Sequence, residues 1–195
     1  MRVYDTLARA TVPLPLSKDE RGRPELKLYV CGVTPYESGH MGHAFTFCAF
    51  DILVRAVEAR GVTVKYVQNV TDVDDPLFER ARRDGVDWKE LAEREEAGLV
   101  RDMAELGWRP PDFMPRVSEE IHGILAAAEA LAAEGFAYPA ADGSVYFDAS
   151  SYKEFGKLSG RSRRSMLAKL RDEELAKFIE TVTGAKTDER TWCSR

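Results

Sequence analysis

The hydrophobic positions between residues 26 and 70 predict a strand, a helix and a second strand. Residues 26–30 and 62–70 are apolar runs, the second rich in β-branched side chains, as in buried strands. Between about residue 42 and residue 60, apolar side chains recur at the spacing of a helix. This order predicts a parallel βαβ unit, because two parallel strands need a crossover connection.

Polar residues interrupt the pattern on either side of this unit. Residues 1–25 read as irregular, with a short edge strand at Val3–Leu7 and a charged loop at residues 18–24. After the unit, Asp87 is placed to cap a helix over residues 88–106.

A second amphipathic helix is predicted over residues 118–134, with Ser118 as its N-cap. Two short apolar segments follow, separated by Asp142-Gly143, a pair typical of tight hairpin turns. The pattern therefore predicts a helix followed by a β-hairpin.

Chemically distinctive residues stand at the ends of both predicted strands. Cys31 follows the first strand, and Asn69, Val70 and Thr71 close the second. Ligands of parallel sheets bind beyond the carboxyl ends of the strands. We therefore expect Cys31 and the second strand end to face one crevice.

The turn between the first strand and the helix has the composition of an anion site. Glycine and proline residues lead into a helix start that carries His40, Gly42 and His43. Free N–H groups and the positive end of the helix dipole attract anions there, and Gly42 leaves space for a ligand to approach the backbone. Capping of the helix is the alternative interpretation of His40.

The segment His40-Met-Gly-His43 resembles the HIGH signature with which class I aminoacyl-tRNA synthetases bind ATP. Together with residues 31–36 and 66–75, it is similar to the start of two sister families. These are cysteinyl-tRNA synthetase and the cysteine ligase of mycothiol biosynthesis. Motifs within residues 75–89 resemble the mycothiol ligase, whereas motifs within residues 145–160 resemble the tRNA synthetase.

The resemblance covers residues 1–171 and implies an α/β fold. This fold is a Rossmann-like parallel sheet, as in the N-terminal half of class I synthetases, with a helical and β-hairpin insertion. The resemblance implies a HIGH-type nucleotide-binding half-domain over residues 1–110 and a connective insertion over residues 111–171. Residues 172–195 would form a divergent tail.

The resemblance also implies a reaction. L-Cysteine and ATP, accompanied by Mg²⁺, would give cysteinyl-adenylate, and the cysteinyl group would pass to tRNA(Cys) or to the amine of an amino-sugar. His40 and His43 would be catalytic, stabilising charge on the transferring phosphate. A core-facing position is the alternative for Thr46. The implied substrate- and adenylate-binding residues are Cys31, Gly32, Thr34, Gly42, Thr46, Asn69, Val70 and Thr71.

Zinc is the resident metal that the resemblance implies, with Cys31 as a thiolate ligand. A zinc-bound thiol would distinguish cysteine from serine through the soft sulfur–zinc bond. The families supply a second Cys, a His and a Glu from the other half of their fold, whereas this chain has only Cys193 there, with no His after it. The ligand set is therefore incomplete, and a small apolar residue at a strand end is the alternative for Cys31.

Asp72, Asp74 and Asp75 are close enough in sequence to suggest a Mg²⁺ site. Carboxylates at a helix N-terminus are also stabilised by the helix dipole. We favour this structural role, with a cap on the following helix and ion pairs to the arginines among residues 80–83.

Two parts of the family pattern have no counterpart in the sequence. We find no Lys-Met-Ser-Lys-Ser-like loop and no anticodon-binding domain. Three hypotheses follow: a truncated or divergent enzyme, a non-catalytic relative that binds nucleotide, cysteine or a partner, and a subunit whose site is completed by another chain or a second copy.

The composition favours a globular protein of a reducing cytoplasm. Hydrophobic residues make up 44% of the 195 residues, enough for a core. The net charge of −5 argues against a surface dedicated to nucleic acid. Three widely spaced cysteines do not suggest disulfides, and no apolar run is long enough to span a membrane.

Overall fold

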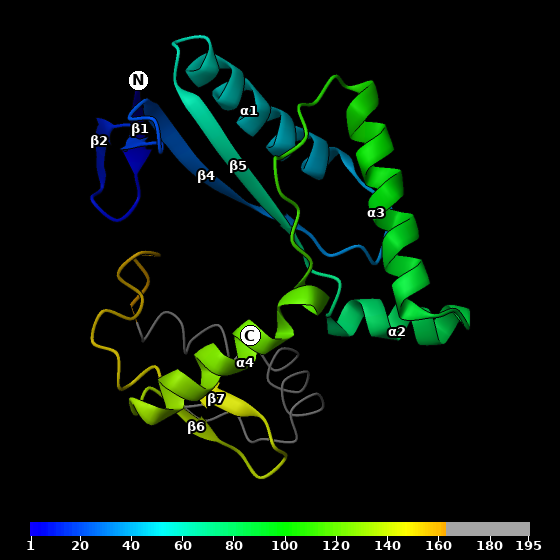
Figure 1. Ribbon diagram of the computed structural model, residues 1–195. Helices are drawn as coiled ribbons and strands as arrows, with labels where there is room; N and C mark the ends of the chain where they lie inside the picture. Colours follow the sequence, from blue (N-terminus) through cyan, green and yellow to red (C-terminus); the bar gives the residue numbers. More distant parts are fainter. Residues whose placement is uncertain (163–195) are drawn as a thin grey trace. The chain divides into compact units, whose positions relative to one another are not determined.

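The computed structural model describes residues 1–162, and its elements follow the predicted order (Figure 1). The chain divides into two compact units. Unit 1 comprises Met1 and residues 13–121, and the described part of unit 2 comprises residues 2–12 and 122–162. The predicted strand–helix–strand unit lies entirely in unit 1.

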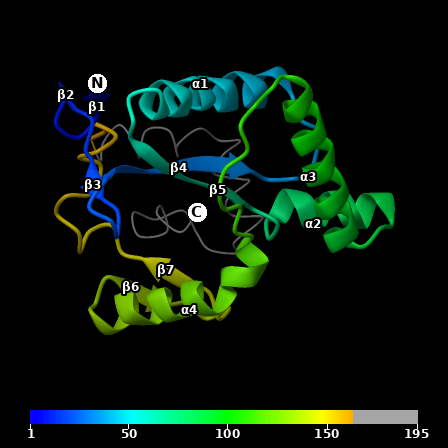
Figure 2. The ribbon, with the colours of Figure 1, turned by 45° about the horizontal axis from the view of Figure 1, so that its top comes forward.

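Unit 1 is built on a sheet of β3 (Ser17–Lys18), β4 (Pro24–Val33) and β5 (Thr63–Val70), in that order. β4 and β5 are parallel and are connected by α1 (Met41–Glu58), while β3 pairs antiparallel with the start of β4. Both long strands run toward the end of the unit at which α1 begins (Figures 1 and 2). The α/β arrangement confirms the predicted fold class.

The core of unit 1 lies between α1 and one face of β4 and β5. It buries together Leu26, Val30, Val54, Val57, Val64 and Tyr66. Alternate strand residues such as Lys27, Tyr29 and Lys65 are exposed, because successive side chains of a strand point to opposite faces. Burial raises the pKa of Tyr66 to about 12, so its hydroxyl stays a donor, which it gives to Gln68 Oε1 at 2.6 Å.

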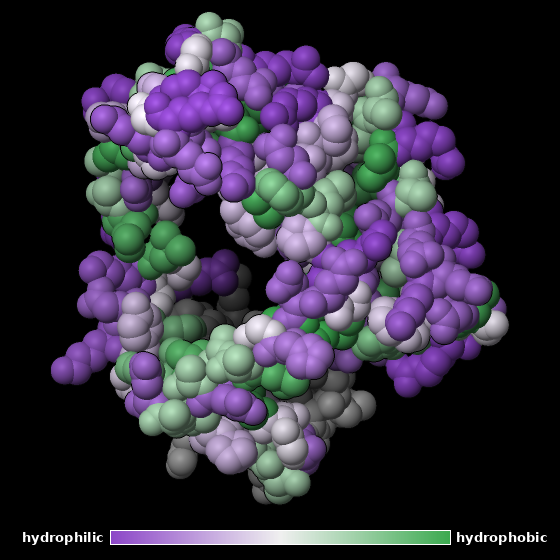
Figure 3. Space-filling view, in the orientation of Figure 1, coloured by the Kyte–Doolittle hydropathy of each residue, from purple (hydrophilic) through white to green (hydrophobic). Residues whose placement is uncertain are grey.

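Helices α2 (Asp75–Asp84) and α3 (Trp88–Glu105) follow β5, and hydrophilic side chains dominate the surface over them (Figure 3). Asp74 is the N-cap of α2, which confirms the predicted carboxylate cap. Asp87 caps α3 as predicted, accepting hydrogen bonds from two backbone N–H groups of the first turn. Arg80 and Arg83 form ion pairs with Asp84 at the end of their own helix, so the prediction that these arginines pair with Asp72 and Asp74 is wrong.

The first 25 residues are more regular than predicted. β1 (Arg2–Asp5) and β2 (Ala10–Pro13) pair with each other, and β3 pairs with β4 across the two ends of the segment predicted as a charged loop. β1 overlaps the edge strand predicted at Val3–Leu7, whereas β2 and β3 have two to four residues and no apolar run, so hydrophobic periodicity does not reveal them.

The carboxyl end of β4 lies further along the chain than predicted. Cys31 is therefore within the strand, not after it, at an irregularity where the register with β5 shifts between Val30 and Val33. A Cβ built on Gly32 would lie 1.5 Å from the backbone oxygen of Asn69. This approach of two backbones leaves no space for a side chain, so the position requires glycine.

The helix α4 (Val117–Ala133) begins one residue before the predicted start, so the prediction of Ser118 as its N-cap is wrong. The carboxylate of Asp72 accepts hydrogen bonds from Ser118 N, at 2.9 Å, and from the Ser118 hydroxyl. Asp72 is only 5% exposed and is 46 residues distant in sequence. A carboxylate from the end of β5 thus stabilises the start of a distant helix.

Unit 2 contains the predicted hairpin, formed by β6 (Ala137–Pro139) and β7 (Val145–Phe147). Gly143 in its turn has a φ of 85°, which favours glycine. The ring of Phe147 packs with those of Phe136, Tyr152 and Phe155. Among residues 1–162, no helix has the length and apolar character needed to cross a membrane.

Substitution of Gly32 by alanine tests the backbone contact between β4 and β5. We expect Gly32→Ala to lower the free energy of unfolding by about 3 kcal/mol, because the strands must separate to admit the methyl group. Gly98→Ala is the matched control, since its Cβ would lie 3.8 Å from the nearest atom, a guanidinium nitrogen of Arg101. This control should stabilise α3 by about 0.5–1 kcal/mol. Urea unfolding midpoints at unchanged slope measure both, and equal midpoints would contradict the contact.

Substitution of Asp72 tests the long-range cap of α4. Asp72→Ala removes the acceptor of two hydrogen bonds and is expected to cost about 1–2 kcal/mol of stability. Asp87→Ala, which removes the local cap of α3, should cost a similar amount in the same urea titration. A loss confined to Asp87→Ala would show that Asp72 contributes nothing to the start of α4.

Candidate functional site

The predicted histidine pair lies at the start of α1. His40 is the N-cap residue, and its Nδ1 accepts a hydrogen bond from Gly42 N at 3.0 Å. In return, His43 Nδ1 accepts from His40 N at 3.4 Å, which closes a reciprocal capping box. The two rings stack with their centroids 3.9 Å apart. Capping by His40 is therefore present, and it uses only one nitrogen of each ring.

The capping bonds also decide where each imidazole carries its proton. A neutral imidazole has one donor nitrogen and one acceptor nitrogen. Because Nδ1 is the acceptor in both His40 and His43, the proton of each neutral ring is on Nε2. The pair thus carries two Nε2–H donors at the positive end of a helix dipole, an arrangement suited to an anionic oxygen.

Aromatic rings and a glycine support this pair. His43 stacks on Phe47 with centroids 6.0 Å apart, and Phe47 stacks on Trp108 at 6.1 Å. Phe47 and Trp108 are buried, so the row of rings is anchored in the core. A Cβ on Gly42 would lie 2.8 Å from the ring of His40. Glycine between the histidines therefore allows the cap itself, in addition to the ligand approach that the sequence predicts.

The surroundings of His43 affect its titration. Desolvation by burial, and secondarily the neighbouring His40, lower the pKa of His43 below 6.5. Both effects disfavour the imidazolium form. At neutral pH the structure therefore favours a neutral His43 with its proton on Nε2.

Asn69 joins the carboxyl ends of β4 and β5. Its Oδ1 accepts hydrogen bonds from Gly32 N at 2.9 Å and from Tyr29 OH at 2.8 Å. Its Nδ2 donates to Thr71 Oγ1 at 3.1 Å, and Thr71 N donates to Val33 O at 2.8 Å. Most of the hydrogen-bonding capacity of the Asn69 amide is thus used within the protein, next to Cys31.

The other predicted site residues differ in their access to solvent. The thiol of Cys31 is free and exposed, whereas the side chain of Val70 is fully buried. Thr46 is exposed and donates to a carbonyl oxygen one turn earlier, so its core-facing alternative is wrong. Thr34 Oγ1 lies 3.4 Å from Asp74 Oδ2. Val70 is buried as a whole residue, and its N–H donates to Pro115 O at 2.9 Å, so Val70 has no exposed surface for a ligand.

The described residues do not make a complete metal site. Within residues 1–162, no three His, Cys, Asp or Glu side chains group in a way that could hold a metal ion. Cys31 supplies one thiolate, and Cys193 lies outside the described residues. A zinc site needs at least three protein ligands, so these residues alone do not fit zinc. Asp72 and Asp74 serve as helix caps.

Sequence reasoning did not assign Tyr29, Arg80 or Glu95 to the site region. Each contacts a predicted site residue or the loop before the histidines through a hydrogen bond from a distant segment. Side chains alternate between buried and exposed along β4, and this pattern places Tyr29 on the exposed face. No local pattern in the sequence indicates a role for Arg80 or Glu95.

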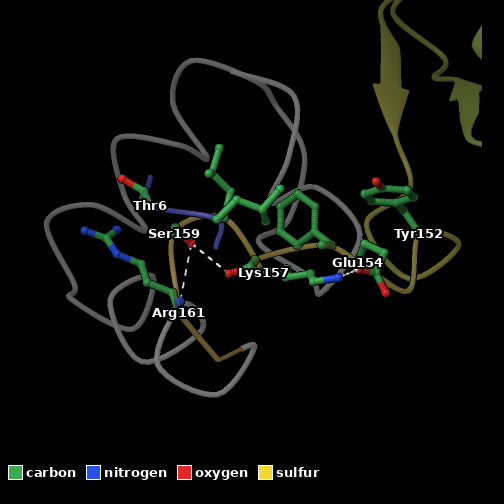
Figure 4. Close-up of a pocket in the computed structure, with 10 residues that line it drawn as sticks. Thr6, Tyr152, Glu154, Lys157, Ser159 and Arg161 are labelled. Atoms are coloured by element: carbon green, nitrogen blue, oxygen red, sulfur yellow. Dashed lines mark hydrogen bonds and ion pairs between the residues drawn. The ribbon is translucent and has the colours of Figure 1, made fainter. Parts of the chain in front are cut away.

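A separate pocket of about 920 Å³ lies in unit 2, between the β1–β2 turn and residues 152–161 (Figure 4). Leu7, Phe155 and Leu158 line it together with polar residues, and Lys157 pairs with Glu154 at its margin. None of the predicted site residues line this pocket.

The sequence of the chain matches a family model described as tRNA synthetases class I (C) catalytic domain, over residues 18–189. The chain belongs to this family. Its Rossmann-like β4–α1–β5 unit and its histidine pair at the start of α1 lie within the matched residues.

Over the aligned segments, the sequences of curated relatives are 41–49% identical to that of the chain. A protein of Cellulomonas flavigena is 49% identical over 74% of this chain and 36% of its own length. One of Renibacterium salmoninarum is 44% identical over 85% and 41%, and one of Mycolicibacterium smegmatis is 42% identical over 86% and 40%. All three are named L-cysteine:1D-myo-inositol 2-amino-2-deoxy-alpha-D-glucopyranoside ligase. The chain spans about two fifths of the length of these relatives.

Among solved structures, the ternary complex of an Agrobacterium radiobacter LeuRS with tRNA and LeuAMS is similar to the chain. The TM-score is 0.49 and the identity 19%, over 81% of this chain and 23% of that one.

The lowered pKa of His43 predicts how stability depends on pH. Below about pH 6.5, the unfolded chain takes up a proton at this position before the folded protein does. The free energy of unfolding should therefore decrease as the pH falls from 6.5 to the pKa of folded His43, and no further below it. His43→Gln, which keeps a capping side chain, should remove this part of the dependence. Urea midpoints of both proteins between about pH 5 and pH 8 measure the difference, and parallel curves would contradict it.

Proposed function

We propose that the chain is the HIGH-bearing part of an ATP-dependent cysteine ligase whose acceptor is the amine of an amino-sugar. The observation that carries this proposal is the name shared by the curated relatives, which describes an L-cysteine ligase acting on an amino-deoxy-glucopyranoside of inositol. Because the chain spans about two fifths of these relatives, the proposal concerns the activation half of the reaction first.

In the first step, a carboxylate oxygen of L-cysteine attacks the α-phosphorus of ATP. The new oxygen–phosphorus bond replaces the bond to the β-phosphate, so cysteinyl-adenylate forms and pyrophosphate leaves with its magnesium. Negative charge grows on the phosphate oxygens in the transition state, and donors fixed in advance stabilise it. The Nε2–H groups of His40 and His43 are such donors, and their capping bonds hold the rings in place.

In the second step, the acceptor amine attacks the carbonyl carbon of the adenylate, and AMP leaves as the amide bond forms. The amine must be unprotonated to attack, and its nitrogen releases one proton to solvent as the amide forms.

Transfer to tRNA(Cys) is the second candidate, since the matching family model is described as a tRNA synthetase domain. The net charge of −5 is unfavourable to a large RNA-binding surface on this chain. We therefore rank the amino-sugar first.

Cys31 is proposed to contact the substrate cysteine, and its free thiol fits a reducing cytoplasm. In the presence of a zinc ion, a thiolate at this position would be one ligand, and the metal would supply selectivity for sulfur. The other ligands would have to come from outside the described residues, from another chain or from a second copy.

Cysteine-dependent exchange of pyrophosphate into ATP tests the activation step. His40→Asn and His43→Gln keep side chains that can cap the helix but remove the imidazole donors. Each is expected to lower the exchange rate about 100- to 1000-fold with little change in the urea midpoint. Exchange that survives both substitutions would contradict the assigned role. No exchange by the unsubstituted chain would reject catalysis by this chain alone and favour a site completed by another chain.

The acceptor is tested in the same preparation by supplying either an amino-deoxy-glucopyranoside of inositol or tRNA(Cys) transcript with cysteine and ATP. AMP release that depends on the sugar supports the first candidate, and release that depends on the RNA supports the second.

A further inference from the structure

We propose that Arg80 is a positioning residue, which holds the loop of residues 34–39 and thereby orients the histidine pair toward ATP. This inference rests on the proposed function for its ligand, but its structural part can be measured without one. Arg80 lies on α2, and in the described structure none of its hydrogen bonds or ion pairs goes to His40 or His43.

The loop carries the chain from the end of β4 to the N-cap of α1 and has no helix or strand of its own. Pro35 is fully buried, whereas Tyr36, Glu37 and Ser38 are exposed. Since His40 immediately follows, the position of its ring depends on how firmly this exposed loop is held.

Arg80 binds three separate partners with its guanidinium group. One terminal nitrogen donates to the backbone carbonyl oxygen of Tyr36, in the middle of the loop. The other terminal nitrogen lies 3.7 Å from Glu95 Oε1 on α3, and Nε donates to Asp84 Oδ2 at 2.9 Å. Arg80 is only 23% exposed, so solvent screens these contacts less than those of a surface arginine.

The end of the loop is held by the same region of α3. Ser38 Oγ lies 3.3 Å from Glu95 Oε2, so Glu95 contacts both Arg80 and the loop. One residue later, a Cβ on Gly39 would lie 2.7 Å from a methyl carbon of Leu99. The chain is thus held at Tyr36, Ser38 and Gly39, just before His40, and at Tyr36 the contact is a hydrogen bond from Arg80 to the loop backbone.

The geometry requires arginine rather than a positive charge alone. Its planar fork presents donors in fixed directions to three acceptors at once. A lysine at this position keeps the charge but has a single ammonium group, which cannot reach Tyr36, Glu95 and Asp84 together. Arg80→Lys therefore separates positioning from net charge.

The experiment compares Arg80→Lys with Arg94→Lys in the whole chain. Arg94 is the matched control, because it lies on α3 and its guanidinium also pairs with Glu95, at 3.2 Å, but it is 58% exposed and donates to no loop residue in any contact of the described structure. The readouts are backbone amide order parameters of residues 36–43, the affinity for MgATP by titration calorimetry and the urea midpoint.

In Arg80→Lys, we expect the order parameters of residues 36–39 to fall from about 0.85 to below about 0.6, while those in β5 and the second half of α1 stay unchanged. MgATP should bind about tenfold more weakly, as for loss of one hydrogen bond to a charged group. Arg94→Lys should leave both quantities as in the unsubstituted chain. A loop that stays rigid in Arg80→Lys, or that loosens equally in Arg94→Lys, overturns the proposal.

The two failures are distinguishable. If the unsubstituted chain does not bind MgATP, the proposed function fails for this chain, and the order parameters still decide whether Arg80 holds the loop. If Arg80→Lys lowered the order parameters throughout unit 1 and also lowered the urea midpoint, Arg80 would have a general structural role. This result would also overturn the proposal.

Discussion

The close approach of β4 and β5 at Gly32 and Asn69 is the constraint on which the site region depends. Two backbones meet there at a distance that excludes any Cβ, and the Asn69 amide bridges the strands at the same point. This contact fixes the irregularity of β4, leaves the Cys31 thiol exposed beside it, and sets the direction in which the chain enters the loop before α1.

The histidine pair shows how one set of atoms can meet a structural and a chemical demand. A helix start leaves backbone N–H groups without partners, and the Nδ1 atoms of His40 and His43 satisfy two such groups. Because each ring uses one nitrogen for the backbone, the other is left as a donor of defined position. A ligand oxygen would then meet groups that need no rearrangement, which is the condition for strong electrostatic stabilisation.

The segments around this pair come from parts of the chain that are distant in sequence. Trp108 stacks on Phe47, which in turn stacks on the ring of His43, while Arg80 on α2 and Glu95 on α3 contact the preceding loop. The matched family and the names of the relatives suggest which reaction a histidine pair at a helix start could serve. The contacts explain why the loop and the two rings hold one arrangement.

The sequence by itself determined the β4–α1–β5 order, the caps Asp74 and Asp87, the hairpin turn at Gly143 and the presence of a histidine pair at a helix start. These features depend on periodicity and on neighbours within a few residues, which a sequence displays directly. The short strands β2 and β3 carry no such periodicity, and the extension of β4 through Cys31 depends on its partner strand. Only the tertiary structure decided that Asp72 caps a helix 46 residues away and that Arg80 reaches a loop 44 residues earlier. Contacts of this kind depend on which buried faces of the elements pack together, and the local sequence pattern does not indicate that packing.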